Sequence, residues 1–334
     1  MNKNYFLVTG CCGFVGYHLA RRLLLNKKNH VIGIDNFTNY YSKNLKLDRL
    51  KILKKKNFKF FNINLSNKIK LNKFFIRYKF TAVFHAAAQA GVLYSYKNPN
   101  SYFKNNLIAT KNIVDLIKKY KNVEKFIFCS SSSVYGDQKI FPVKENFKLN
   151  PKNYYAITKK KSEDYIKKEL IINIHLKNYI IFRLFTVYGP YGRPDMFLIK
   201  NLFNIYKNIT IKLYNYGKHY RDFTYIDDVI NIFLIFLKRD IYIKNNIINL
   251  CGSRPIKIIV LINLFKKFFK KNFKYTLEGR RVGEVFKTYG SNKKLVKYFK
   301  YRKFVSIVKG VKKTIHWFNK YKNKKNLIIK IQGI

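Results

Sequence analysis

Short runs of apolar residues recur through the first half of the chain, separated by longer stretches that mix apolar and polar positions. The apolar runs occupy residues 5–10, 30–35, 58–64, 82–88, 125–131 and 179–185. They are dense in Val, Ile and Phe rather than alternating, as expected for parallel strands covered on both faces. The mixed stretches with helical character are 14–27, 101–120 and 155–170. Strands that alternate with helices predict an α/β fold with a doubly wound parallel sheet of the Rossmann type.

This rhythm loosens after about residue 188, and Gly and Pro cluster at 189–194. We therefore expect residues 1–185 to form the Rossmann domain and residues 186–334 to form a smaller C-terminal α/β domain that binds the substrate. A strand-like and a helix-like segment within residues 222–240 are expected to return to the first sheet.

Composition and charge narrow the classes of function. The 334 residues suffice for one large or two modest domains, and a hydrophobic content of 48% fits a folded protein. The net charge of +53 could indicate nucleic-acid binding. The excess is mostly Lys scattered along the chain, however, and it accompanies abundant Asn, Ile, Phe and Tyr, which A/T-rich codons encode. We therefore expect no specific nucleic-acid partner, and only weak, salt-sensitive adhesion to polyanions.

The cysteines and histidines do not indicate a metal centre. Four Cys lack CxxC spacing, and six His lack the spacing of metal ligands, so no metal is expected. Cys129 lies inside a strand-like apolar run and Cys251 directly follows another, so we interpret the cysteines as buried, reduced thiols. The chain begins with a strand-like segment, has no signal-peptide pattern and contains no apolar run of about 18 residues. A cytoplasmic protein without a membrane partner is expected.

Three regularly spaced glycines follow the first predicted strand, in the segment TGCCGFVG. Gly10, Gly13 and Gly16 form G-x-x-G-x-x-G between a strand and a helix. Glycines at this spacing let the backbone approach a pyrophosphate, which then meets free N–H groups at the helix N-terminus. Asp35 ends the next strand, where a carboxylate can accept from both ribose hydroxyls and would repel a 2′-phosphate. Together these features predict NAD rather than NADP as cofactor.

Tyr155 and Lys159 stand four residues apart at the start of the helix predicted over 155–170. The spacing alone carries no information, because this composition yields about 4.6 such pairs by chance, and the chain contains five. Position distinguishes this pair, which follows Ser131 by 24 residues and lies downstream of the glycines. Lowering the pKa of a tyrosine from about 10 to 7 requires about 4 kcal/mol, which one cation at about 4 Å can supply. Lys159, one helical turn away, is the expected cation.

The order of these features resembles the extended short-chain dehydrogenase/reductase superfamily, and further segments are similar to those of UDP-glucuronate 4-epimerases. Those segments are DNFTNYY (35–41), AAAQAGV (86–92), SSSSVYG (130–136), FTVYGPYGRPDM (185–196) and YNYGKHYRDFTYIDD (214–228). The resemblance covers about residues 5–318. It implies an isomerase that interconverts UDP-glucuronate and UDP-galacturonate with tightly held NAD and supplies precursors of surface polysaccharides. It also implies a homodimer packed through the helices at 101–120 and 155–170.

The resemblance further implies roles for individual residues. Tyr155 takes the proton of the sugar 4-hydroxyl while C4 gives hydride to NAD; the 4-keto sugar turns over, and hydride returns to its other face. Lys159 also binds the nicotinamide ribose. Ser131 matches the catalytic hydroxyl, with Ser132 as the alternative in a run of four serines. The expected cofactor-binding residues are Gly10, Gly13, Phe14, Val15, Gly16, Asp35, Asn36, Asn64, Ala86, Ala87 and Lys159.

A second set of positions is implied for the substrate. These are Ser132, Thr186, Arg193, Tyr214, Arg221 and Arg281. Arg193 can hold the C5 carboxylate with two charge-assisted hydrogen bonds. Thr186 stands where UDP-glucose epimerases typically carry Asn. Arg221 and Arg281 match positions that hold the UDP diphosphate, and Tyr214 lies in the region that covers uracil.

The chain departs from the family pattern at several positions. Leu93 replaces the usual Arg of AGVR, Asn64 and Asn67 replace two Asp after the third strand, and Glu284 replaces an Asp. An Asn oxygen can still accept a hydrogen bond from the adenine amine. Four alternatives stay open: UDP-glucose 4-epimerase, a decarboxylating UDP-glucuronate enzyme, a basic nucleic-acid-binding module and a degenerate, non-catalytic NAD-binding protein.

Overall fold

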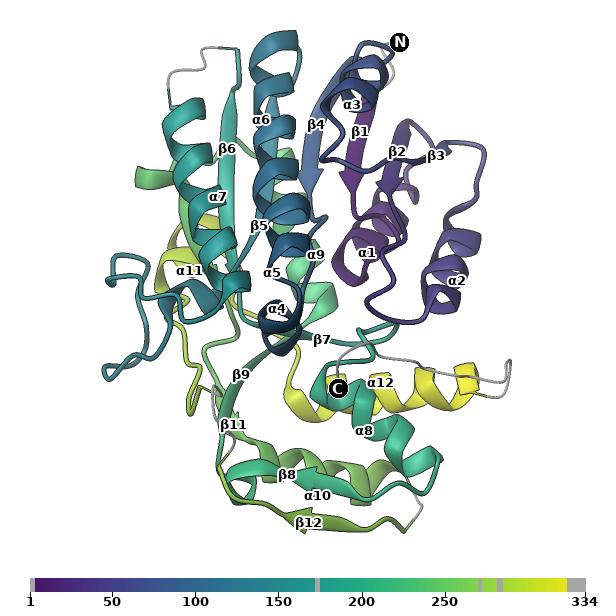
Figure 1. The fold of residues 1–334 in the computed structure, drawn as a ribbon, viewed down its shortest axis with the longest axis vertical. Helices are drawn as coiled ribbons and strands as arrows, with labels where there is room; N and C mark the ends of the chain where they lie inside the picture. The colour runs from purple at the N-terminus through teal and green to yellow at the C-terminus, as the bar shows by residue number, and fades with distance from the viewer. Residues whose placement is uncertain (1–3, 172–174, 270–271, 281–284, 323–334) are drawn as a thin grey trace.

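A seven-stranded parallel sheet forms the centre of the molecule (Figure 1). The computed structural model describes residues 4–171, 175–269, 272–280 and 285–322. From edge to edge the strands are β3 (Phe58–Asn62), β2 (Asn29–Asp35), β1 (Asn4–Thr9), β4 (Phe80–His85), β5 (Lys125–Ser131), β6 (Asn178–Leu184) and β10 (Ile247–Leu250). The chain starts in the middle of the sheet and winds outward to both edges, which is the doubly wound arrangement. The predicted fold class is therefore confirmed.

The continuous apolar runs of the sequence become strands that are buried on both faces. All seven residues of β5 are buried, and β4 and β6 flank it in parallel. A strand in that position has no solvent side, so its polar positions disappear from the pattern. The six predicted strands all occur, with ends within three residues of those expected. The strand-like run that precedes Cys251 becomes β10, and its place beside β6 in the same sheet is what the pattern did not predict.

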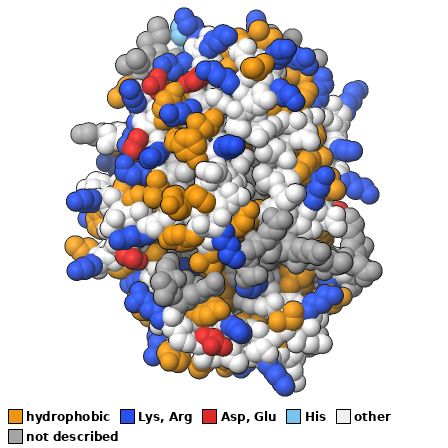
Figure 2. All heavy atoms as spheres, viewed as in Figure 1, with side chains coloured by type: hydrophobic (Ala, Val, Ile, Leu, Met, Phe, Trp, Pro, Cys, Tyr) orange, Lys and Arg blue, Asp and Glu red, His pale blue; other side chains and the backbone are white. Residues whose placement is uncertain are grey.

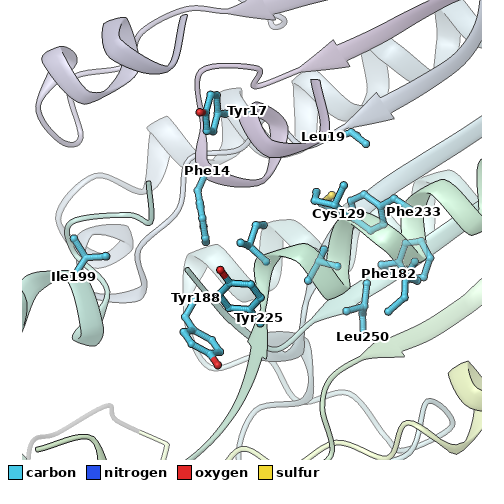
Figure 3. Packing of buried hydrophobic residues seen from close by; sticks show 14 of the residues in the cluster. Phe14, Tyr17, Leu19, Cys129, Phe182, Tyr188, Ile199, Tyr225, Phe233 and Leu250 are labelled. Atoms are coloured by element: carbon cyan, nitrogen blue, oxygen red, sulfur yellow. The ribbon is translucent and has the colours of Figure 1, made fainter. Parts of the chain in front are cut away.

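Helices cover both faces of the sheet. One face packs against α3 (Lys68–Phe75), α6 (Ala109–Tyr120) and α7 (Tyr154–Leu170), and the other against α1 (Phe14–Leu23), α2 (Lys43–Leu53), α9 (Ile226–Lys238) and α11 (Lys293–Phe299). Alternate residues of β1 divide between the two cores, with Leu7 in the first and Phe6 and Val8 in the second. In the second core (Figure 3), Phe182 of β6 stacks on Phe233 of α9 with ring centroids 5.1 Å apart.

The helix predicted over 101–120 is interrupted by a π-helical turn. It consists of α5 (Pro99–Tyr102), the π turn Phe103–Ile108 and α6, and α4 (Val92–Lys97) precedes it. The side chain of Asn106 in the turn accepts from the backbone N–H of Gln89 at 2.7 Å and donates to the hydroxyl of Thr158 at 3.1 Å. The turn is thereby fastened to α7. Such turns occur frequently at functional sites.

The second half of the chain builds two small sheets beyond the carboxyl ends of the large one (Figure 1). β9 (Tyr220–Tyr225) pairs with β7 (Thr186–Tyr188) and β11 (Pro255–Lys257), and β8 (Ile211–Leu213) pairs with β12 (Tyr275–Leu277). The other elements are α8 (Phe197–Tyr206), α10 (Ile258–Phe269), α12 (Ile307–Lys322) and short helical turns at Ser132–Tyr135, Tyr214–Gly217 and Lys244–Asn246. β9 thus lies outside the large sheet, whereas α9 packs against it.

The surface carries its positive charge in a dispersed way. On the face shown in Figure 2, Lys and Arg side chains are spread among hydrophobic and neutral ones rather than gathered in one stripe. Within the described part of the chain, no helix combines the length and apolar character needed to span a bilayer.

Candidate active site

One cavity of about 470 Å³ opens where the carboxyl ends of β1, β2, β4 and β5 meet. This edge is where doubly wound sheets bind their ligands. The predicted residues that line the cavity are Gly10, Gly13, Phe14, Val15, Gly16, Asp35, Asn36, Ala86, Ala87, Ser131, Ser132, Tyr155, Lys159, Thr186 and Arg193. Segments far apart in the sequence therefore contribute to a single site.

The glycine loop after β1 forms a tight cradle of backbone. Gly10 has a φ of +68°, and a Cβ there would come within 2.8 Å of the Ala87 backbone. A Cβ on Gly16 would come within 2.2 Å of the Gly10 carbonyl oxygen. Gly13 caps α1 without any side-chain hydrogen bond, so the first-turn N–H groups are left for a ligand. This cradle fits the pyrophosphate of a dinucleotide.

Asp35 at the end of β2 is placed to accept hydrogen bonds from the adenosine ribose. One carboxylate oxygen accepts from Cys12 N at 3.1 Å, and the other accepts from Phe37 N at 2.9 Å. Each oxygen keeps a lone pair for a ribose hydroxyl. A half-buried carboxylate at this place disfavours the additional phosphate of NADP, so the residues present fit NAD.

Tyr155 and Lys159 occupy the first turns of α7. The side chain of Asn153 accepts from Ala156 N at 2.9 Å and caps this helix. The ammonium of Lys159 donates to the Cys129 carbonyl oxygen at 2.7 Å and lies 4.7 Å from the centroid of the Phe128 ring. Burial lowers the pKa of Lys159 to about 8, although the charge of Glu163 opposes this shift.

Tyr155 lies in an environment with opposing effects on its acidity. Burial raises the pKa of the Tyr155 phenol, while a hydrogen bond with Ser131 and the charge of Arg193 lower it. The sequence pointed to Lys159 as the nearby cation. In the structure the ammonium of Lys159 donates to a carbonyl of β5, and Arg193 is a second cation, whose charge lowers the pKa of the phenol. The serine whose side chain lowers the pKa of Tyr155 is Ser131, the expected catalytic hydroxyl.

Arg193 is paired within the cavity. Its guanidinium meets both oxygens of Asp195, with Nε 3.0 Å from Oδ1. Tyr40 donates its hydroxyl to Oδ2 of Asp195 at 3.0 Å. Sequence reasoning named neither Tyr40 nor Asp195, although both stand in quoted family segments, DNFTNYY and GRPDM.

Asn64, Arg221 and Tyr214 do not line the cavity, although Ile63 and Leu65 on either side of Asn64 do. Asn64 is exposed, and its side-chain oxygen accepts from the backbone N–H and hydroxyl of Ser66 at 3.0 and 2.9 Å. Arg221, on β9, donates to the carbonyl of Tyr220 at 2.8 Å, and Tyr214 begins a helical turn in the second half of the chain. Arg281 and Glu284 lie outside the described residues. Leu93, by contrast, lines the cavity.

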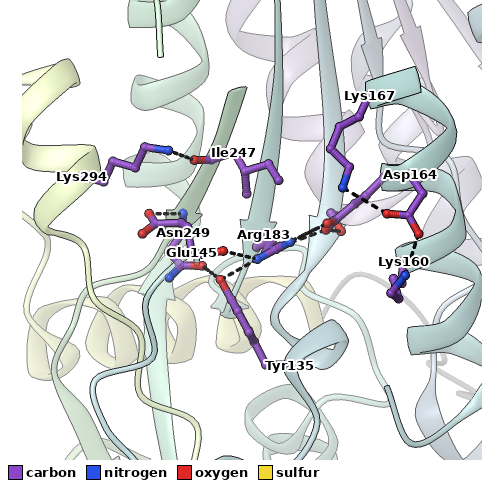
Figure 4. A network of polar contacts seen from close by, with 11 residues as sticks. Tyr135, Glu145, Lys160, Asp164, Lys167, Arg183, Ile247, Asn249 and Lys294 are labelled. Carbon is purple, nitrogen blue, oxygen red and sulfur yellow. Dashed lines mark hydrogen bonds and ion pairs between the residues drawn. The ribbon is translucent and has the colours of Figure 1, made fainter. Parts of the chain in front are cut away.

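A buried polar network around Arg183 connects α7, β6 and β10 (Figure 4). Arg183 of β6 and Glu163 of α7 form an ion pair with Nη2 2.7 Å from Oε2, and their side chains are 2% and 0% exposed. Ser130, beside the catalytic candidate, donates to Glu163, and Arg183 also donates to the Tyr135 hydroxyl at 2.9 Å. Tyr135 in turn donates to Asn249 of β10 at 2.6 Å. The network fixes α7 relative to β5, β6 and β10.

The doubly wound sheet, the dinucleotide cradle and the Tyr155 cluster define a dinucleotide-dependent enzyme of the extended short-chain dehydrogenase/reductase type. The model of the NAD dependent epimerase/dehydratase family matches residues 6–251, and the chain belongs to this family. The family predicted from the sequence motifs is thereby confirmed.

Named relatives and solved structures cover nearly the whole chain. A UDP-glucuronate 4-epimerase of Thermodesulfobacterium geofontis is 36% identical over 94% of this chain and 95% of its own length. The crystal structure of UDP-glucuronic acid 4-epimerase from Bacillus cereus, in complex with UDP-glucuronic acid and NAD, matches with a TM-score of 0.86 at 30% identity, over 95% of this chain and 99% of that chain. UDP-glucose 4-epimerase from Thermotoga maritima with UDP-glucose also has a TM-score of 0.86, at 26% identity and the same coverage.

Proposed function

We propose that this protein is a UDP-glucuronate 4-epimerase, an isomerase that interconverts UDP-glucuronate and UDP-galacturonate with bound NAD. One observation carries the proposal: the dinucleotide cradle, the Tyr155–Ser131 pair and Arg193 line the same cavity. A cofactor and a sugar bound there lie next to each other, with a base and a carboxylate-binding cation at the sugar. The relatives named above support the choice of a uronate substrate.

Gly10, Gly13, Gly16 and Asp35 would hold NAD, which would supply the acceptor and donor of the hydride for C4 of the sugar. Tyr155 removes the proton of the 4-hydroxyl and gives it back after the sugar has turned. Burial opposes the phenolate, so the hydrogen bond from Ser131 and the charge of Arg193 are needed to make Tyr155 a base near neutral pH. Lys159, with a pKa of about 8, adds positive charge beside the reacting groups.

Arg193 and Thr186 recognise the part of the sugar that distinguishes a uronate from a hexose. A guanidinium binds a carboxylate with charge-assisted hydrogen bonds, whereas the hydroxymethyl group of UDP-glucose offers it no charge. We also propose that the UDP moiety contacts Arg221, Arg281 and Tyr214.

The decisive experiment is incubation with UDP-glucuronate and NAD, followed by chromatographic separation of the nucleotide sugars. Formation of UDP-galacturonate is the expected result. Release of CO₂ with a UDP-pentose would assign the decarboxylating activity instead, and no turnover would refute the proposal. UDP-glucose 4-epimerase is the second candidate, favoured by the similarity to the Thermotoga maritima enzyme. A higher kcat/KM for UDP-glucose than for UDP-glucuronate would select it.

Replacement of Arg193 by Ala should raise KM for UDP-glucuronate about 10- to 100-fold, as expected for loss of a charge-assisted contact. KM for UDP-glucose serves as the internal control and should change less. A change in KM for the uronate below about twofold would contradict the proposed role.

We also propose a homodimer formed through α7 and the helix of residues 99–120. Phe103, which is 48% exposed, lines a surface groove there with Leu107 and Tyr165. An exposed apolar groove on adjacent helices is suited to pairing with a second copy. Sedimentation should give a dimer, and Phe103→Asp should dissociate it. A wild-type monomer would contradict this proposal.

We infer a cytoplasmic location, where the four buried, unpaired cysteines stay reduced, and a role in supplying galacturonate for surface polysaccharides. Fractionation of cells and analysis of sugars released from their surface test the two statements.

A further inference from the structure

Three side chains from two separate segments meet at the sugar end of the cavity, beside Tyr155. Arg193 and Asp195 face each other as a fork, with two N–H groups of the guanidinium on two carboxylate oxygens. Tyr40 donates its hydroxyl to Asp195 at 3.0 Å. All three line the cavity. The guanidinium proposed to receive the substrate is therefore already bound by a protein carboxylate.

The arrangement is closely packed. The side chain of Asp195 is 6% exposed and that of Arg193 is 23% exposed. Tyr40 is 7% exposed, and its hydroxyl oxygen lies so near Gly91 that a Cβ there would come within 2.1 Å of it. Gly91 itself has a φ of +101°, which other residues rarely adopt. Tyr40 thus has little freedom to move, and a fork of this kind fixes the plane of the guanidinium.

The two charges act on Tyr155 in opposite directions. The charge of Arg193 lowers the pKa of Tyr155, and the charge of Asp195 raises it. The remaining groups that face Tyr155 are the hydroxyl of Ser131, the thiol of Cys129 and the ring of Tyr102. Burial raises the pKa of the Cys129 thiol to about 12, so it stays neutral over the working range. Arg193 and Asp195 are therefore charged groups that act on Tyr155 in opposite directions, while the ammonium of Lys159, one turn along the same helix, faces the Cys129 carbonyl.

We propose that Asp195, held by Tyr40, is a positioning residue that fixes the guanidinium of Arg193 at the sugar end of the cavity and balances its charge there. The inference rests on the proposed function. Two N–H groups of Arg193 are engaged by Asp195, so a substrate carboxylate meets the remaining donors of an ordered, nearly neutral pair. Removing the charge of Asp195 leaves a cation that attracts the carboxylate at least as strongly, but in a less defined position. The substitution should therefore lower kcat without weakening substrate binding.

The test compares Asp195→Asn with Arg193→Ala under the same conditions. For Asp195→Asn we expect kcat to fall about tenfold, as for loss of one charge-assisted contact, while KM for UDP-glucuronate stays equal or falls. Arg193→Ala instead raises KM. Tyr155 must lose its proton to act, so activity rises with pH through the pKa of Tyr155. The acid limb of the pH profile should move to lower pH in Asp195→Asn and to higher pH in Arg193→Ala. If the Arg193–Asp195 pair had a merely structural role, the acid limb would move in the same direction in both variants, and that outcome would overturn the inference.

Tyr40→Phe is the conservative second variant, which removes the hydroxyl and keeps the ring. It should lower kcat about threefold, in the same sense as Asp195→Asn. Tyr301→Phe is the matched control, because Tyr301 also donates to a buried carboxylate, that of Asp228 at 2.7 Å, away from the cavity. It should keep wild-type kcat and pH profile. Equal kinetics for Tyr40→Phe and Tyr301→Phe, together with an unchanged acid limb in Asp195→Asn, would refute the inference.

Failure of the proposed function and failure of the positioning role of Asp195 give different results. If the wild-type protein converts UDP-glucose and not UDP-glucuronate, the proposed function fails, and the acid limbs are then measured with UDP-glucose. Opposite shifts of the limbs in Asp195→Asn and Arg193→Ala would still support the positioning role. If the protein converts neither sugar, calorimetry with UDP-glucuronate decides the inference: Asp195→Asn should bind with undiminished affinity and Arg193→Ala at least tenfold more weakly. Equal affinities would refute it.

Discussion

Replacing Glu163 by Gln tests the buried network that holds α7 against the sheet. Glu163 is completely buried and accepts from two N–H groups of Arg183, with Nε 3.1 and 3.2 Å and Nη2 2.7 Å from its oxygens, and from the hydroxyl of Ser130. Glutamine keeps the size of the side chain and one acceptor oxygen. It removes the negative charge and presents N–H donors to a guanidinium that has only donors.

The expected loss of stability follows from the burial of the pair. Breaking a buried ion pair by neutralising one partner costs about 3–5 kcal/mol, because the other charge stays buried without compensation. Arg183 keeps its bonds to Tyr135 and the Glu145 carbonyl, and glutamine still accepts one bond, so we expect about 3 kcal/mol. For a protein of 334 residues that loss corresponds to a decrease in Tm of about 4 °C.

Thermal and urea-induced unfolding of the wild type and Glu163→Gln measure this difference. The matched control is Glu124→Gln, which breaks an ion pair with Lys177 at 2.9 Å whose side chains are 45% and 59% exposed. An exposed pair contributes less than about 1 kcal/mol. Losses of equal size in the two variants would show that the buried pair does not stabilise the fold. A second readout is the alkaline limb of activity, which should move to lower pH, because the charge of Glu163 raises the pKa of Lys159.

Three further predictions concern the loop, a buried carboxylate and the base. Gly16→Ala should weaken NAD binding at least about tenfold, because its Cβ would lie 2.2 Å from the Gly10 oxygen; Gly279→Ala, with nothing within 4 Å, is the control in a titration with NAD and should bind normally. Burial raises the pKa of Asp222 from 3.8 to about 7, so the folded state binds the extra proton between these values, and wild-type stability falls by up to about 4 kcal/mol as pH rises from about 4 to 8. Asp222→Asn should remove that slope in urea unfolding, and parallel profiles would contradict the assignment. Tyr155→Phe should nearly abolish epimerisation while NAD binding persists, and a wild-type rate would exclude Tyr155 as the base.

The local pattern of apolar residues was sufficient to predict the strands that are buried on both faces. The runs that became β1 to β6 are continuous because those strands have no solvent side, and the glycine loop is recognisable because its chemistry needs glycine at fixed positions. The apolar run of β10, Ile247–Leu250, was recognisable as strand-like, but its four residues do not show in which sheet it lies. Its place beside β6 depends on pairing between segments more than 60 residues apart in the chain.

Site residues that stand in a recognisable motif could be predicted from the sequence. Contacts between side chains from different segments could not. Tyr155 and Arg193 stand in recognisable segments. The pairing of Arg193 with Asp195 and Tyr40 depends on two loops meeting in space. The direction of the Lys159 side chain toward the Cys129 carbonyl depends on how α7 packs on β5. Spacing along a helix gives the reach of such a cation but not the acceptor that it finds.

The strand β10 and the helix α9 have a consequence for how the chain can be synthesised and divided. Both come from the second half of the sequence, yet β10 pairs with β6, and α9 covers Phe182 of that strand. Lys125 of β5 donates to the last carbonyl groups of α9 at 3.2 and 3.1 Å. A ribosome that has released only the first 190 residues presents a sheet with an open edge and an uncovered aromatic face. The N-terminal half of the chain therefore needs β10 and α9 to cover the edge and the aromatic face of its sheet. A fragment ending at the Gly- and Pro-rich loop should aggregate rather than fold.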